Sequence, residues 1–192
     1  MFSGTEPVAR RHEIVGRGHA EMLVPMIAGL PGGGRADAIL VDVGPGSFTG
    51  IRVGVAAARG LALGWNALLH GYSSLALLAC AIFTERDELD RVAVVIEGGH
   101  GEVFLQQFAR HPVLAPLTPI ASLRPEAALA QLGEMPVTGN GVSWLPGLPE
   151  SRNLGGALPD SRFALALPED LRSRPPSPFY GRAPDAKPQA AR

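Results

Sequence analysis

The sequence predicts an α/β fold in which a mixed sheet is covered by flanking helices. Three observations support this prediction: a continuous apolar strand over residues 37–43, a long helix of small residues directly after it, and further alternation of strands and helices through about residue 90. Strands that alternate with helices are typical of βαβ units. A chain of 192 residues is long enough to bury a sizeable hydrophobic core.

The first helix is expected in the segment GHAEMLVPMIAGL, after the end of a strand and a turn. Leu23, Met26, Ile27 and Leu30 fall at i, i+3, i+4 and i+7, so they share one face of a helix. Pro25 lies inside the same segment. Because proline lacks an amide hydrogen, we expect a kink there.

The later elements are predicted from apolar runs and from the turn residues between them. The strand DAILVDV is apolar almost throughout, which is typical of a strand covered on both faces. Ser73 or Ser74 can cap a helix over LALLACAIF. A hairpin is expected over residues 92–108, and a short helix at about residues 125–132 can be capped by Ser122.

The order of these elements divides the chain into three parts. We expect a first lobe over residues 1–105 and a smaller second lobe over residues 106–180. The second lobe is rich in proline and glycine, which predicts many loops. A polar tail over residues 181–192 is expected to lack fixed structure.

Composition argues against several classes of protein. The formal net charge is −1, whereas a nucleic-acid binder that acts alone usually carries a basic surplus. No apolar run reaches the roughly 18 residues of a membrane span, and the N-terminus is too polar for a signal peptide. The single cysteine, Cys80, permits no disulfide within the chain, so we expect a cytoplasmic protein.

A glycine-rich turn, GPGSFTG, follows the first predicted strand and opens the long helix. Gly44, Gly46, Ser47 and Thr49 could bind a phosphate or another anion there, because amide groups and the helix dipole favour negative charge. The spacing differs from the dinucleotide-binding pattern, and the turn lacks the lysine of a P-loop. A tight structural turn capped by Ser47 or Thr49 is the alternative.

The long helix carries a row of small residues. Gly50, Gly54, Ala58 and Ala62 recur every four residues, and such a row lets another backbone approach closely. Each helical glycine costs about 1 kcal/mol relative to alanine, so close packing must offset this cost. The packing partner is either the protein's own sheet or a helix of another chain. The apolar residues beside the row are Ile51, Val55, Leu61 and Trp65.

No familiar catalytic pattern is present. No two histidines stand at metal-binding helical spacing, and the chain lacks a G-x-S-x-G nucleophile turn. Asp42 could face a site but is expected to make a structural hydrogen bond. Arg52 and Arg59 lie seven residues apart, near one helical face. They could contact phosphates or the carboxylates of a partner; the alternative is that they face only solvent.

Three segments together resemble the bacterial TsaB (YeaZ) family: GRGHAEMLVPMI, VDVGPGSFTGIRVGVAAARGLALG and FYGRAPDAKPQ. The resemblance implies the fold of actin, Hsp70 and sugar kinases, which is ribonuclease H-like. It implies a non-catalytic subunit that binds and activates a catalytic TsaD-type subunit through a bundle of helices. That complex, with a TsaE-type ATPase, transfers a threonylcarbamoyl group to adenosine 37 of tRNAs that read codons beginning with A.

The resemblance also implies where contacts form. The partner helices correspond to residues 19–30 and 47–65, and homodimerisation through the same surface is expected when the partner is absent. It implies no metal, no cofactor and no membrane, and contact with tRNA only through the complex. The interface residues that it implies are His19, Leu23, Met26, Ile27, Gly50, Ile51, Gly54, Val55, Ala58, Leu61 and Ala62.

Two further expectations concern the start of the chain and rival functions. Family members begin with a strand of the type ILALDTS, and this sequence begins inside the strand that follows it. A sheet edge is therefore expected to be exposed. The rival functions on the same fold are an active phosphotransferase with residues 44–50 on phosphate, and a glycoprotease-like metalloenzyme.

Overall fold

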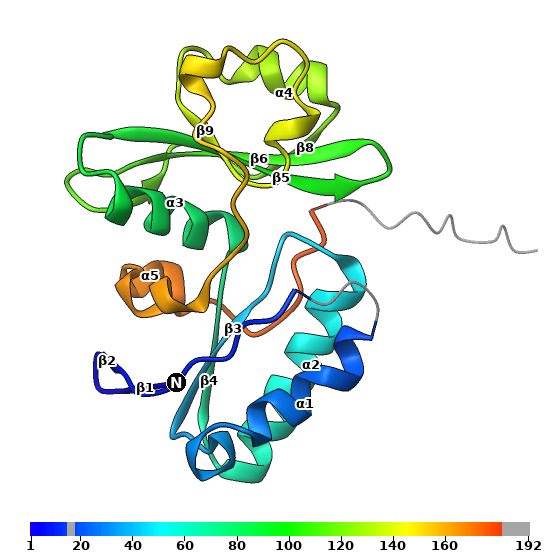
Figure 1. Ribbon diagram of the computed structural model, residues 1–192, viewed down its shortest axis with the longest axis vertical. Helices are drawn as coiled ribbons and strands as arrows, with labels where there is room; N and C mark the ends of the chain where they lie inside the picture. The colour runs from blue at the N-terminus through cyan, green and yellow to red at the C-terminus, as the bar shows by residue number, and fades with distance from the viewer. Residues whose placement is uncertain (15–17, 182–192) are drawn as a thin grey trace, which may run out of the picture.

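The computed structural model describes residues 1–14 and 18–181 and contains two sheets and a small N-terminal hairpin (Figure 1). The hairpin pairs β1 (Phe2–Ser3) with β2 (Glu6–Pro7), and the predicted tail lies outside the described residues except for Gly181. The first sheet pairs β3 (Ala38–Asp42) with β4 (Leu68–Tyr72) in parallel. The second sheet has the order β7-β6-β5-β9, with β8 also paired to β6. Its strands are β5 (Arg91–Gly99), β6 (Glu102–Ala109), β7 (Ala115–Pro116), β8 (Ala121–Leu123) and β9 (Val137–Thr138).

Both predicted partner helices are confirmed as helices: α1 spans His19–Ala28, with Pro25 inside it, and α2 spans Phe48–Trp65. The remaining helices are α3 (Ser74–Glu85), α4 (Pro125–Gln131) and α5 (Glu169–Arg172), with short 3₁₀ helices at Pro31–Gly34, Val142–Trp144, Glu150–Arg152 and Ser161–Ala166. Helices α1 and α2 lie beside the first sheet, α5 contacts β4 of the same sheet, and α3 and α4 pack against the second sheet (Figure 1).

Strand β3 is less covered than its sequence predicts. Ala38 is exposed and residues 39–42 are only half-buried. The reason is that β3 pairs with β4 alone among the described residues, so its other edge has no strand beside it. The expected open sheet edge is therefore present in the described part of the chain.

The middle of strand β5, residues 92–96, is apolar and buried, because both faces of its sheet are covered there. Val92, Val94 and Ile96 face the core cluster that contains α3. Ala93 and Val95 face a second cluster, which contains Ala128 and Leu132 from around α4. Side chains of a strand alternate between faces, so five consecutive buried positions require a layer on each side.

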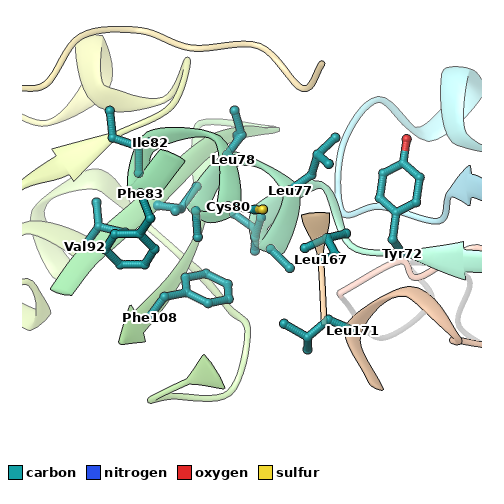
Figure 2. Packing of buried hydrophobic residues seen from close by; sticks show 14 of the residues in the cluster. Tyr72, Leu77, Leu78, Cys80, Ile82, Phe83, Val92, Phe108, Leu167 and Leu171 are labelled. Atoms are coloured by element: carbon teal, nitrogen blue, oxygen red, sulfur yellow. The ribbon is translucent and has the colours of Figure 1, made fainter. Parts of the chain in front are cut away.

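Helix α3 lies between the two sheets and is buried along most of its length. Its residues pack against Phe104 and Phe108 of β6 and against Leu167 and Leu171 of the C-terminal part (Figure 2). The helix therefore connects the second sheet to the segment that returns to the first one.

Some predicted details differ from the structure. The predicted division into lobes stays a prediction; residue 105 itself lies in β6, which pairs with β5 along its length. Ser122 is not a helix cap, because it lies in β8 and donates a hydrogen bond to Glu102 at 2.7 Å. Arg124 occupies the N-cap position of α4 instead.

Phe108 offers a direct test of the core around α3. Its side chain is fully buried, so Phe108→Ala should lower the free energy of unfolding by about 3–5 kcal/mol through lost burial and a residual cavity. Denaturant unfolding measures this change. Leu63→Ala is the control, because Leu63 is 87% exposed and its truncation should change stability by less than about 0.5 kcal/mol. Equal effects of the two substitutions would contradict this core.

Candidate functional site

The glycine-rich turn between β3 and α2 is largely covered by the protein itself. Gly44 is buried and Gly46 half-buried. The φ angle of Gly44 is +98°, and a Cβ atom at this position would lie 3.0 Å from the carbonyl oxygen of Phe179. Only glycine fits here, because the backbone conformation and the close contact both exclude a side chain.

The first turn of α2 is capped from within the chain. Ser47 occupies the N-cap position, and its hydroxyl accepts a hydrogen bond from the Gly50 amide at 3.3 Å. This is the structural alternative that the sequence left open. Of the four residues predicted for anion binding, only Ser47 and Thr49 are exposed.

Asp42, the last residue of β3, joins the turn to α3. Its carboxylate accepts hydrogen bonds from the Gly44 amide at 2.8 Å and from the Ser74 hydroxyl at 2.7 and 2.9 Å. Burial raises the pKa of the Asp42 carboxyl to about 6, against the lowering effect of these hydrogen bonds. The predicted structural role of Asp42 is confirmed. Its negative charge, when present, disfavours a phosphate in the same turn.

A C-terminal segment, residues 173–181, crosses the carboxyl ends of β3 and β4; we call it the strap (Figure 1). Gly71 and Arg174 exchange two backbone hydrogen bonds, at 2.7 and 3.0 Å. The Phe179 amide donates to the Val43 carbonyl at 2.7 Å. Ligands of open α/β sheets commonly bind at the carboxyl ends of strands. Here the strap occupies that position.

The second half of the row of small residues predicted on α2 faces inward. Ala58 and Ala62 of the row, and Val55 beside it, are buried within this chain. They pack on the side of α2 that faces the first sheet, so the first of the two proposed packing partners, the protein's own sheet, takes up this part of the row. The other predicted interface residues of α2 are half-buried: Gly50, Ile51, Gly54 and Leu61.

A second row of small residues faces outward, and the sequence analysis missed it. Ala56, Gly60 and Gly64 are exposed, and Leu63 beside them is 87% exposed. A Cβ atom added at Gly60 or Gly64 would meet nothing within 4 Å. The spacing of four was visible in the sequence, but which row faces outward depends on how α2 packs.

The predicted face of α1 lines a groove of about 380 Å³. Leu23, Met26 and Ile27 form one wall, and Met1 and Phe2 belong to the other. These three helix residues are half-buried by their own chain.

The outward side of α1 carries apolar residues that were not predicted to matter. Met22 is 39% exposed and Val24 is 51% exposed. His19 begins α1, and the structure does not describe its side chain.

Comparison with known proteins decides the family. A "tRNA threonylcarbamoyladenosine biosynthesis protein TsaB" from Haemophilus influenzae is 31% identical over 175 residues, which cover 81% of this chain and 73% of the relative. The chain belongs to the TsaB (YeaZ) family. A TsaB of the same description from Escherichia coli is 31% identical over 170 residues, which cover 83% of this chain and 72% of that one.

The solved structures agree with this membership of the TsaB family. YeaZ from Pseudomonas aeruginosa matches with a TM-score of 0.68 and 28% sequence identity, covering 81% of this chain and 77% of that chain. The family model described as "TsaD: tRNA N6-adenosine threonylcarbamoyltransferase" matches residues 12–116. The mixed sheets, the helices and these similarities confirm the actin-like, ribonuclease H-like fold that the sequence predicted.

Within residues 1–14 and 18–181, no three His, Cys, Asp or Glu side chains group in a way that could hold a metal ion. In the same part of this TsaB-family chain, no helix is both long and apolar enough to cross a bilayer.

The buried Asp42 predicts a pH dependence of stability. Its folded-state pKa of about 6 lies above the ordinary value of 3.8, so the folded protein holds the proton more tightly. The free energy of unfolding should therefore fall as pH rises from about 4 to about 7, by on the order of 2 kcal/mol.

Asp42→Asn provides the matched variant, because its amide oxygen can still accept from Gly44 and Ser74. The difference in stability between the natural protein and the variant, measured by denaturant unfolding at several pH values, should change in favour of Asn as pH rises. A pH-independent difference would refute the assignment.

Proposed function

We propose that this chain is an accessory subunit of tRNA threonylcarbamoyladenosine biosynthesis, without catalytic activity of its own. It binds a catalytic TsaD-type subunit through α1 and α2 and holds that subunit in an active conformation. Family membership supports the pathway, since the TsaB relatives carry that description. The similarity to a tRNA N6-adenosine threonylcarbamoyltransferase supports a partner with a related helix pair.

One observation carries the proposal: α2 presents exposed small residues where its own chain places nothing. Gly60 and Gly64 each weaken the helix, yet beyond the neighbouring residues and backbone of α2 itself nothing lies within 4 Å of where their Cβ atoms would be. Leu63 lies exposed between them. A partner helix that packs closely on this face would use the glycines and bury the leucine.

The proposed contact surface lacks three residues that the sequence implied and includes six that it did not. Val55, Ala58 and Ala62 are covered by this chain, so a partner cannot reach their side chains. The half-buried residues of the predicted set remain part of the proposed surface, with the outward residues added. These additions are Met22, Val24, Ala56, Gly60, Leu63 and Gly64.

The glycine-rich turn supports a non-catalytic role over the rival phosphotransferase. The Phe179 carbonyl of the strap lies against Gly44, and the Asp42 carboxylate accepts a hydrogen bond from the Gly44 amide. A phosphate at the turn would have to displace the strap and tolerate the carboxylate.

Isothermal titration with ATP tests this rival directly, and we expect no micromolar binding by the chain alone.

The finer assignments follow from the family resemblance. The complex modifies adenosine 37 of tRNAs that read codons beginning with A, and a TsaE-type ATPase assists it. In the absence of the catalytic subunit, two copies of this chain associate through the same α1–α2 face. These steps take place in the cytoplasm.

Gly60→Leu tests the proposed contact surface. The new side chain should hold a partner helix away and abolish co-purification with the TsaD-type subunit of the same organism. Stability should not fall, because the added atoms point into open space and leucine favours a helix more than glycine does. Thermal unfolding of the isolated chain measures the second point.

Gly156→Leu is the matched control, since Gly156 also has open space around it but lies in the C-terminal part of the chain. It should assemble normally. Ala58→Leu is not informative, because Ala58 is buried and a larger residue there would strain the core by about 1–3 kcal/mol. If Gly60→Leu and Gly156→Leu both assemble, the proposed surface is wrong.

A further inference from the structure

An exposed cluster of aromatic rings surrounds Arg52 at the start of α2. The Arg52 guanidinium lies over the Phe48 ring, with its carbon 3.7 Å from the ring centroid. Its Nε donates a hydrogen bond to the Tyr180 hydroxyl at 3.0 Å, and the two rings lie 5.6 Å apart. Phe48 is 58% exposed and Tyr180 is 44% exposed. Contiguous exposed apolar surface often marks a binding site.

The cluster is held in place before any ligand arrives. Phe48 and Tyr180 come from distant parts of the chain, and the strap positions the second of them. Arg59 donates two hydrogen bonds to the Pro176 carbonyl, at 2.8 and 3.1 Å, and one to the Ser177 hydroxyl at 3.1 Å. Rings that are already ordered lose little conformational freedom when a ligand stacks on them.

Arg52 and Arg59 bring positive charge to this part of the surface, although the whole chain carries a net charge of −1. The nearest acidic residue in the sequence is Asp42, whose carboxylate accepts hydrogen bonds from Gly44 and Ser74; none occurs between Val43 and Thr84 or in the strap. Neither Arg52 nor Arg59 forms an ion pair among the described residues. The two terminal nitrogens of Arg52 have no hydrogen-bond partner in that part of the chain, so they remain available to an anion.

We propose that Phe48, Arg52 and Tyr180 form a stacking site for an unpaired RNA nucleotide. An aromatic face accepts any base, and a guanidinium beside it can contact the adjoining phosphate. This inference rests on the proposed function, and it adds direct RNA contact to a subunit expected to meet tRNA only through the complex. A protein partner fits less well. Its carboxylate would bind the Arg52 guanidinium through two parallel hydrogen bonds, and the Arg52 Nε already donates to the Tyr180 hydroxyl.

Tyr180→Ala tests the stacking site. An RNA hairpin with an unpaired loop, labelled for fluorescence anisotropy, serves as the probe for the full chain alone and for its complex with the TsaD-type subunit. The variant should bind the hairpin about tenfold more weakly, as expected for loss of one stacked base. Tyr180→Phe keeps the ring and should bind within about threefold of the natural protein. Arg52→Ala should reduce the salt dependence of binding by about one phosphate contact.

Trp144→Ala is the matched control, because Trp144 is an exposed aromatic residue in the second lobe, 39% exposed. It should leave RNA binding unchanged, and thermal unfolding verifies that each variant is folded. Equal binding of the hairpin by Tyr180→Ala and the natural chain would overturn the proposal. Three other results would also overturn it. The natural chain could bind a blunt duplex RNA as tightly as the hairpin, ATP could displace the hairpin, or Tyr180→Ala could lose the protein partner and still bind RNA. Gly60→Leu separates the two proposals, since it tests assembly without touching the rings.

Discussion

The burial of α3 is the constraint on which the rest of the molecule depends. Its side chains fill the space between the second sheet and the C-terminal helices, so the helix cannot move without opening both (Figure 2). Asp42 fixes its start by accepting from Ser74 at the end of β3. Helix α3 thereby contacts both sheets, and the C-terminal part of the chain returns across the first sheet.

The path of the strap across the first sheet determines which groups lie at the carboxyl ends of β3 and β4. In many α/β proteins the carboxyl ends of the strands form a binding cleft. In this TsaB-family chain the strap lies there, with Phe179 bonded to Val43 and its carbonyl against Gly44. The strap backbone fills this position, and the outward sides of α1 and α2 stay exposed.

Helix α2 then has two small-residue rows with different physical roles. The inner row, represented by Ala58 and Ala62, allows close packing on the protein's own sheet. The outer row, represented by Gly60 and Gly64, does not pack on another element of the chain. Its glycines lower helix stability, and no packing within the chain offsets this cost. Both of the alternatives that the sequence raised are therefore compatible with one helix, but they involve different residues. The aromatic cluster at the start of the same helix adds a third surface.

The sequence by itself determined the main helices and strands and the structural role of Asp42, because apolar periodicity and turn residues act locally. The family followed from the resemblance of three segments to known members. It also indicated that α2 must pack closely, since four glycines in one helix need compensation. Only the tertiary structure decided which row of α2 faces outward, because helical spacing gives several smooth rows and contact with β3 selects among them. The pairing of Phe48 with Tyr180 was likewise beyond the sequence. Their contact depends on the path of the strap across the sheet, and no local pattern encodes an approach between residues so far apart in the chain.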